Sequence, residues 1–250
     1  MKSQPVETSI TRIAPGEIEV RGHSLPEMIG SRSFSEVTFL LLSGVMPDER
    51  QARMLDAMLV SCVDHGINAP SACVARTVAS CGSPVQAAMA AGVASIGEHH
   101  GGAGEACARL LQETLHQGQG HDIAELAGRV VQQYHASKQR LPGFGHRVHN
   151  PDPRAERLFA LAKENGFWGQ FMQLLTALQT AWQAETGKLL PINVDGAIAG
   201  LLSELGLDWQ LGKSLFIIAR SVGLAAHVHE QILIGKPLQF APPVKNAPKP

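Results

Sequence analysis

Apolar residues recur at helical spacing along most of the chain, and this spacing predicts an all-α fold. Most of the predicted helices are bounded by residues that commonly cap or stop a helix. We expect helices over 34–43, from Leu55 to a stop at Gly66, from Pro84 through 87–94, over 123–137, from Pro153 to about Gly166, and over 168–183, 196–205 and 212–233.

Strand-forming sequence is confined to the N-terminal end. Two short segments rich in β-branched residues, Thr8–Ile13 and Glu17–Arg21, flank the turn sequence Ala14-Pro15-Gly16. Such a pair predicts one small β-hairpin in front of the helices.

One predicted helix consists almost entirely of small residues. Its run Ala87–Ala94 contains alanine, glycine, valine and one methionine. Small side chains let helices approach closely, so we expect this segment to lie between other helices or across a subunit boundary, and we expect a homodimer.

Composition excludes several classes of function. The formal net charge is -1 and 17% of residues are charged, so we expect no nucleic-acid partner and no polybasic membrane anchor. The four cysteines show no CxxC pairing and the first residues, Met1–Gln4, do not lead into an apolar stretch. We expect a cytoplasmic protein, with no apolar run long enough to cross a membrane.

A glycine-rich loop carries the strongest chemical signal. His146 follows two glycines in the segment Leu141–His146, where the backbone can approach a ligand closely. Asp152 then suits an N-cap, Pro153 a first helical position, and Arg154 lies on the helix they begin. A histidine can exchange a proton near neutral pH, and an arginine binds a carboxylate with two parallel hydrogen bonds.

Four other polar sites lie at glycines or within apolar helices. They are Asp64-His65-Gly66, the segment Gly97–Ala106 that contains His99-His100, the helix start Asn193-Val194-Asp195-Gly196, and Arg220 inside an apolar helix. The helix dipole favours an ionised Asp195. A buried Arg220 needs an anion, whether a ligand or a core carboxylate, and Asp195 also suits a plain N-cap.

Metal chemistry finds little support in the spacing of the histidines. His227 and His229 are two apart, so on a helix they point in different directions, and no HExxH motif occurs. We expect neither a metal site nor a permanently bound cofactor.

Taken in order, these segments resemble the citrate synthase superfamily over nearly the whole chain. The motif His100-Gly101-Gly102-Ala103 resembles the first catalytic histidine motif of that family. The second is matched by Pro142–His146 with Asp152-Pro153-Arg154, and the catalytic aspartate by Asn193-Val194-Asp195. The hairpin and the segment 39–44 resemble its N-terminal part.

The resemblance implies a role for each of these residues. Asp195 is the base that takes a proton from an acyl-CoA thioester, His100 hydrogen-bonds the thioester oxygen, and His146 donates a proton to the ketone of a 2-oxo acid. The implied carboxylate ligands are His65, Arg154, Arg220 and Lys236. Coenzyme A, as part of the substrate, is expected to bind through its adenine to open backbone groups of Leu141, Pro142, Gly143, Phe144 and Gly145, with Arg147 near a phosphate.

The resemblance also implies two helical domains with the site between them. The larger combines residues 1–100 with 207–250, and the smaller comprises 101–206. Closure of the cleft would exclude water from a reactive thioester.

Departures from the synthases affect the expected reaction. The connection from Val45-Met46-Pro47 to Asp64 is one helix, as in the short citryl-CoA lyases and the C-terminal module of ATP-citrate lyase, and Gly145-His146-Arg147-Val148 also favours that branch. His100, absent from the ATP-citrate lyase module, keeps synthase-type condensation to citrate or methylcitrate as the alternative. Lys236 stands where synthases have an arginine that reaches the neighbouring subunit, and it lacks the bidentate fork. A non-catalytic protein that binds CoA or a tricarboxylate is the third reading.

Overall fold

The computed structural model describes residues 8–145 and 151–238, and within them the chain is helical with a small N-terminal sheet. The predicted all-α fold with an N-terminal hairpin is therefore confirmed. The strands are β1 (Thr11–Ala14), β2 (Glu17–Val20) and β3 (His23–Ser24). The helices are α1 (Leu25–Met28), α2 (Phe34–Ser43), α3 (Glu49–Cys62), α4 (Pro70–Ser80), α5 (Val85–Ala94), α6 (Ala103–Gln117), α7 (Ile123–Ala136), α8 (Pro153–Glu164), α9 (Gln170–Thr186), α10 (Val194–Glu204) and α11 (Leu211–Ile234).

The N-terminal sheet is antiparallel, with β2 between β1 and β3. The register of the hairpin pairs Thr11 with Val20 and Ala14 with Glu17. Val20 is buried with Met28 of α1 and Leu40 of α2, which joins the sheet to the first helices. The two-residue strand β3 is an addition that the sequence pattern did not predict.

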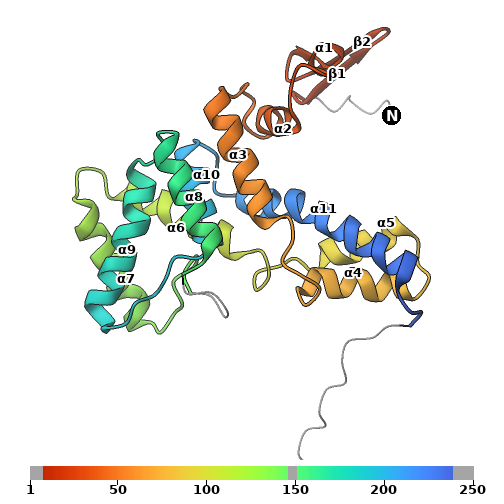
Figure 1. Ribbon diagram of the computed structural model, residues 1–250. Helices are drawn as coiled ribbons and strands as arrows, with labels where there is room; N and C mark the ends of the chain where they lie inside the picture. The colour runs from red at the N-terminus through yellow and green to blue at the C-terminus, as the bar shows by residue number, and fades with distance from the viewer. Residues whose placement is uncertain (1–7, 146–150, 239–250) are drawn as a thin grey trace, which may run out of the picture.

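The remaining helices form a body and an arm, which Figure 1 shows to either side of α3. Helices α6 to α10 make up the body, where α7 packs on α9 and α10 packs on α6, α8 and α9. The arm consists of α4, α5 and the second half of α11. Because α11 runs from the body into the arm, one continuous helix determines how the two parts are placed.

The body and the arm each have a hydrophobic core, and the two cores differ in the size of their side chains. In the body the fully buried side chains are mostly large, for example Leu111, Leu174 and Leu201. In the arm, four buried alanines (Ala72, Ala75, Ala79 and Ala88) pack with Leu224 and Val228 of α11. Small residues therefore set the close spacing of the arm helices, as the run Ala87–Ala94 suggested.

Helix α4 was not predicted from the sequence. It begins with Pro70 at its first position, has no side-chain N-cap, and buries Ala72, Ala75 and Ala79 at spacings of three and four residues. The sequence pattern was therefore present, but small residues give a weak periodic signal.

Helix α11 is longer and more apolar than the sequence analysis expected of any segment. Over an 18-residue window its mean hydropathy is 1.3, so by length and composition it could span a membrane, contrary to the expectation that no segment could. A helix buried in a protein core passes the same test. Helices α3, α4, α5 and α6 all pack on α11, and it carries the buried Arg220.

Both predicted domain boundaries fall between helices. The first lies at residues 100 and 101, just before α6, and the second at 206 and 207, between α10 and α11. The division into two domains that close on each other stays a prediction.

Candidate active site

The candidate site lies where α3, α6, α10 and α11 meet. A small cavity of about 10 Å³ is lined there by Asp195 of α10, Cys62 of α3, Phe216 of α11, and Gly101 and Gly104 at the start of α6. Four separate stretches of sequence thus contribute to one cavity wall, and Asp195 supplies its carboxyl group.

Asp195 occupies the second position of α10. The N-cap of this helix is Asn193, whose side-chain Oδ1 accepts a hydrogen bond from the Gly196 N–H (3.1 Å), so the reading of Asp195 as a plain N-cap is wrong. Burial raises the pKa of Asp195, an effect that the positive charges of Arg154 and Arg220 only partly offset. The helix dipole favours the ionised form, but desolvation acts against it and the net shift of the pKa is upward.

The glycine-rich loop is bonded directly to the segment that carries Asp195. The Gly143 carbonyl accepts from the Asn193 N–H (3.1 Å), the Gly145 N–H donates to the Pro191 carbonyl (2.7 Å), and the Asn193 side-chain amide donates to the Gly145 carbonyl (2.7 Å). We expected these backbone groups to be open for contacts with adenine. All three are instead hydrogen-bonded within the protein. Leu141, Pro142 and Phe144 remain predicted CoA contacts together with the two glycines.

This junction requires glycine on both sides. Gly143 has φ +82°, and a Cβ on it would lie 2.6 Å from the sulfur of Cys107. A Cβ on Gly196 would lie 2.3 Å from the Gly143 carbonyl oxygen. The loop and the first turn of α10 therefore touch backbone to backbone.

A single carboxylate caps two helices beside Asp195. Asp152 is 1% exposed, and its Oδ1 accepts from the Arg154 N–H (3.1 Å) at the start of α8. Its Oδ2 accepts from the Val194 N–H (3.1 Å) at the start of α10. Burial alone would raise the pKa of Asp152, but hydrogen bonds from Arg154 and Val194 outweigh it and lower that pKa. The cap on α8 was predicted, whereas the bond to α10 joins residues too distant in sequence to be foreseen.

Arg154 is held on the same carboxylate. Its guanidinium donates to both oxygens of Asp152, at 3.0 Å from Nε and 2.8 Å from Nη2. Its charge still acts on Asp195, whose pKa it lowers. The predicted role of Arg154 as a carboxylate ligand stays a prediction.

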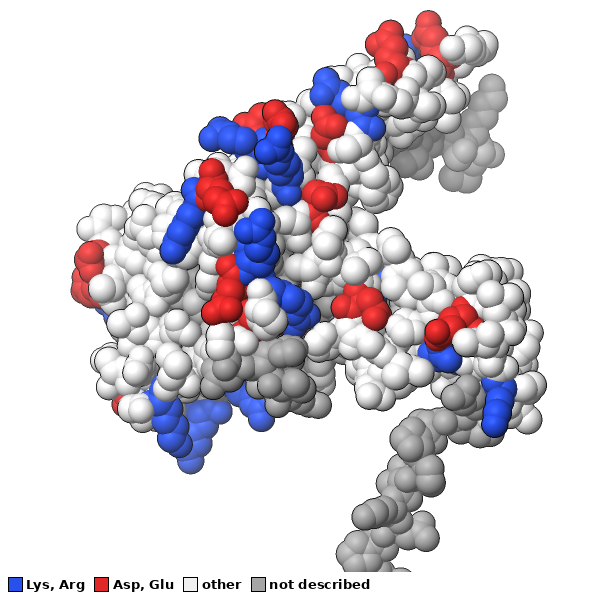
Figure 2. All heavy atoms as spheres, viewed as in Figure 1, with Lys and Arg blue, Asp and Glu red and all other residues white. Residues whose placement is uncertain are grey.

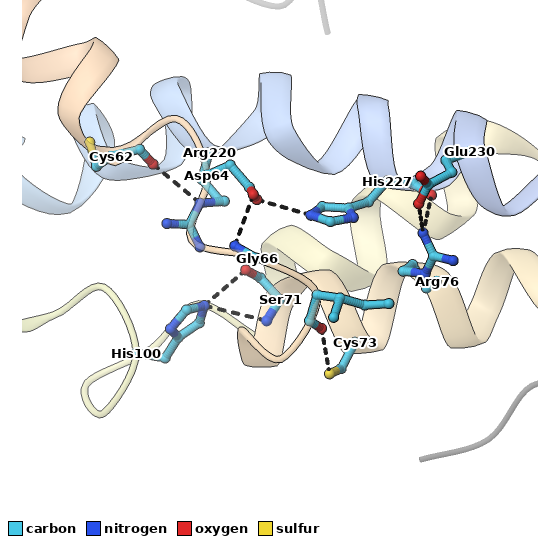
Figure 3. Close-up of polar contacts among 11 residues, drawn as sticks. Cys62, Asp64, Gly66, Ser71, Cys73, Arg76, His100, Arg220, His227 and Glu230 are labelled. Atoms are coloured by element: carbon cyan, nitrogen blue, oxygen red, sulfur yellow. Dashed lines mark hydrogen bonds and ion pairs between the residues drawn. The ribbon is translucent and has the colours of Figure 1, made fainter. Parts of the chain in front are cut away.

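His100 is oriented by the first turn of α4. Its Nε2 accepts a hydrogen bond from the Ser71 backbone N–H (3.3 Å) and lies 2.9 Å from the Ser71 hydroxyl oxygen, as Figure 3 shows. A nitrogen that accepts a hydrogen bond carries no hydrogen, so the neutral ring carries its proton on Nδ1. Sequence reasoning missed Ser71, because the helix that carries it was not recognised.

The surroundings of His100 favour the neutral ring. Burial lowers the pKa of His100, and the positive charge of Arg220 lowers it further. The positive end of the α4 dipole acts in the same direction. A neutral His100 with Nδ1–H is a hydrogen-bond donor, the form that stabilises a developing oxyanion without giving up its proton.

Arg220 lies deep in α11, close to the other two groups. It is 2% exposed, its Nε donates to the Cys62 carbonyl (3.2 Å), and its guanidinium carbon lies 4.8 Å from the centre of the Phe216 ring, which contacts His100 edge-on. Its Nη1 is buried and has no hydrogen-bond partner among the described residues. Burial lowers the pKa of Arg220, and the charge of Asp64 partly offsets this effect. A buried cation with a donor to spare suits an anionic ligand.

The thiols near the site are unsuited to nucleophilic chemistry. Burial raises the pKa of Cys62 to about 12, and it also raises the pKa of Cys107. Because the thiolate is the reactive form, both groups stay unreactive at neutral pH.

The other predicted site residues divide into three groups. His65 lies in the exposed turn after α3, between Asp64 and Gly66. Lys236 follows the end of α11 and is exposed, about 24 Å along the helix from Arg220 at 1.5 Å per residue, so within one chain it does not join the site. His146 and Arg147 lie outside the described residues.

The described residues contain no group of three histidine, cysteine or acidic side chains that could hold a metal ion. His227 and Glu230 instead contact different partners. His227 Nε2 lies 3.0 Å from Asp64 Oδ1, and Glu230 pairs with Arg76 of α4.

Comparison with known families gives one extensive match. A family model described as citrate synthase, C-terminal domain, matches residues 44–238. The citrate synthase of Heyndrickxia coagulans is 32% identical over 206 residues, which cover 80% of this chain and 52% of that protein. The citrate synthase of Acidithiobacillus ferridurans is 30% identical over 200 residues, covering 77% and 50%. The chain thus spans about half the length of the curated relatives it matches.

Solved structures include one of nearly the same length. A citryl-CoA lyase from Hydrogenobacter thermophilus is 38% identical, with a TM-score of 0.90 over 99% of this chain and 96% of that one. An ATP citrate lyase from Methanothrix soehngenii, in complex with citrate and coenzyme A, has a TM-score of 0.83 and 23% identity over 100% of this chain and 43% of that one. The second similarity concerns the fold alone.

Proposed function

The chain belongs to the citrate synthase family, and from this premise we propose that it cleaves citryl-CoA to acetyl-CoA and oxaloacetate. The observation that carries the proposal is the similarity to a citryl-CoA lyase over almost the full length of both chains. The match covers only about half of the length of the curated synthases. The nearness of Arg220 to both Asp195 and His100, whose pKa values its charge lowers, supports enzymatic activity.

The three groups suit the steps of this cleavage. Loss of the hydroxyl proton of citryl-CoA, to His146 in the family pattern, lets the carbon–carbon bond break and leaves the enolate of acetyl-CoA. His100 donates its Nδ1–H to the thioester oxygen on which the negative charge develops. Asp195 then gives its proton to the enolate carbon. Cleavage needs a protonated Asp195, and burial favours that form.

Arg220 supplies the positive charge for a carboxylate of oxaloacetate. Its unpaired Nη1 supports this assignment, because a bound carboxylate would satisfy a donor that the described residues leave unsatisfied. His65 and Arg154 are the further carboxylate ligands in the proposal, and residues 141–145 with Arg147 bind the CoA part. Coenzyme A enters as part of the substrate.

We also propose a homodimer built through the arm. Helix α5 is apolar, yet only Ala88 and Gly92 on it are buried, and Val222 of α11 is 63% exposed. Figure 2 shows that the visible surface of the arm carries few charges. Lys236 in this arrangement serves the partner's site. Sedimentation should give a dimer at micromolar concentration, and a monomer would refute this part.

One assay separates the possible reactions. Purified protein is given citryl-CoA, and oxaloacetate is followed through malate dehydrogenase and NADH; separately it is given acetyl-CoA and oxaloacetate, and free CoA thiol is followed. We expect rapid oxaloacetate formation in the first and little thiol in the second. Faster thiol release would favour the synthase alternative, and binding without either reaction would favour a non-catalytic protein.

The synthase alternative rests on one observation, the oriented His100. The variant His100→Phe tests it, because the change removes the Nδ1–H donor that would stabilise an enolate formed from acetyl-CoA. If cleavage survives in the variant while condensation is lost, His100 serves enolate formation from acetyl-CoA.

The four cysteines are free, which supports a cytoplasmic location as part of the proposal.

A further inference from the structure

The segment between α3 and α4 is fixed to α11 at three successive points. We call residues 62–66 the Cys62–Gly66 turn. Arg220 Nε donates to the Cys62 carbonyl (3.2 Å), and His227 Nε2 lies 3.0 Å from Asp64 Oδ1. Between them, a Cβ on Gly223 would lie 2.3 Å from the Val63 carbonyl oxygen, so helix and turn are in direct backbone contact.

The three α11 residues share one face of the helix. Arg220, Gly223 and His227 follow each other at spacings of three and four, which places them in line along the axis. Figure 3 shows Arg220 at one end of the turn and His227 at the other. Two side chains of the helix thus bind the turn at different points, and the helix backbone contacts the turn directly at Gly223 between them.

Asp64 links His227 to the backbone of the turn. Its Oδ2 accepts a hydrogen bond from the Gly66 N–H (2.8 Å), while its Oδ1 faces His227. Burial would raise the pKa of Asp64, but the hydrogen bonds from Gly66 and His227 outweigh it and lower that pKa, so the group is ionised. His65, a proposed carboxylate ligand, lies between the two residues that this carboxylate ties together.

Asp64 also acts on the second proposed carboxylate ligand. Its negative charge raises the pKa of Arg220, partly offsetting burial. An unpaired Asp64 would be free to move toward the Arg220 guanidinium and compete with a ligand carboxylate. His227, whose side chain is 15% exposed, occupies the opposite side and holds Asp64 away from that position.

We propose that His227 is a positioning residue for the carboxylate site: by holding Asp64 it keeps the Cys62–Gly66 turn, and with it His65, in register with Arg220. It does not touch the substrate. The inference rests on the proposed function in that the bound carboxylate is taken to be that of oxaloacetate or citrate.

The test compares His227→Leu with His227→Gln, whose amide still offers a hydrogen-bond donor to Asp64. In His227→Leu we expect the KM for citryl-CoA and the calorimetric Kd for oxaloacetate to rise about tenfold, as for the loss of one hydrogen bond to a charged group. We expect kcat to change by less than about twofold, because the reacting atoms keep their partners. His227→Gln should recover most of the lost affinity.

Glu230→Gln is the matched control. It lies three residues beyond His227 on α11 and removes the ion pair with Arg76 of α4, without touching the Cys62–Gly66 turn. We expect it to lower the melting temperature as much as His227→Leu while KM and Kd stay as in the wild type. An increase of KM in Glu230→Gln equal to that in His227→Leu would overturn the inference, since any loosening of α11 would then suffice.

The outcomes also separate this inference from the proposed function. Unchanged KM and Kd in His227→Leu would refute the positioning role and leave the lyase activity intact. A wild-type protein that binds oxaloacetate but cleaves nothing would refute the activity, and the Kd comparison would still decide the role of His227. A wild-type protein that binds neither oxaloacetate nor citrate would overturn both.

Discussion

The His100 ring accepts a hydrogen bond at Nε2 from the Ser71 backbone N–H, and this contact determines which ring nitrogen can donate. A backbone N–H in the first turn of α4 occupies Nε2, so the ring donates through Nδ1–H. The pKa of His100 is lowered by burial and by Arg220, so the ring is neutral where an unperturbed histidine is half protonated.

We therefore predict that His100 keeps Nδ1–H and titrates below pH 6.5. A protonated ring can no longer accept a hydrogen bond from Ser71. On the acid side of the pH profile, activity should therefore hold until the pH drops through this lowered pKa. Nitrogen-15 NMR of the histidine rings, with His100→Gln to assign the signal, measures both properties. A resonance of the Nε2–H form, or a midpoint above 6.5, would contradict the prediction.

Ser71→Ala should reduce kcat with little effect on KM. The change removes the hydroxyl 2.9 Å from His100 Nε2 but keeps the backbone donor, so the ring loses part of its orientation. We expect a loss of about tenfold, in line with the loss of one hydrogen bond. Steady-state kinetics checks it, and a raised KM with an unchanged kcat would assign Ser71 to binding instead.

Asp195→Asn should abolish turnover and stabilise the protein at pH 7. Burial raises the pKa of Asp195 in the folded state, so its contribution to stability is present at low pH and is lost as the pH rises through the folded pKa. The amide cannot ionise, so the variant should gain on the order of 1 kcal/mol in free energy of unfolding at pH 7. Urea denaturation at pH 7 and pH 4 should show the gain shrinking at the lower pH. An equal gain at both would contradict the electrostatic explanation.

Arg220→Gln should remove stabilisation by the ligand. At 100 times its Kd, oxaloacetate should stabilise the wild type by about 2.7 kcal/mol and raise Tm by roughly 5–10 °C. Without the guanidinium the shift at the same concentration should be small. Arg129→Gln is the control, since Arg129 pairs with Glu125 on the exposed face of α7 and should leave the shift intact. An undiminished shift in Arg220→Gln would exclude it as a carboxylate ligand.

Gly196→Ala should destabilise the protein by about 3 kcal/mol or more. Its Cβ would lie 2.3 Å from the Gly143 carbonyl oxygen, and neither backbone can move without breaking the bonds to Asn193. Gly128→Ala in α7 is the matched control, because nothing lies within 4 Å of its Cβ and alanine favours a helix. Thermal denaturation of both variants measures the difference, and similar Tm values would disprove the close contact.

The sequence predicted those parts of the molecule that depend on neighbours along the chain. Asp152 and Pro153 signalled the start of α8, and α2 occupies the predicted span 34–43, where Ser33 caps its start and Gly44 ends it. Helix α4 was not predicted, because its buried face consists largely of alanines and no capping side chain precedes its first residue. The hydrophobic signal there was too weak to distinguish a helix from a loop.

Relationships across the chain could not be read in this way. The ionised form expected for Asp195 followed from its place near a helix start, but its pKa depends on how deeply the surrounding helices bury it. Ser71 and His227 act on residues far away in sequence, and a single histidine or serine gives no sign of such a partner. The resemblance to citrate synthases pointed to Arg220 and His100 as candidate site residues, while the contacts that hold them required the structure.

The shared carboxylate of Asp152 has a consequence for how the molecule opens. Because Asp152 is both the N-cap of α8 and the acceptor for the Val194 N–H, a movement of the α8 start would take this acceptor away from the first turn of α10. The two ends, one on each side of the 42-residue interval between Asp152 and Val194, therefore form one cooperative opening unit. Hydrogen exchange at the two amides should report a single opening free energy, and the buried Asp195 side chain next to Val194 should gain access to solvent in the same event.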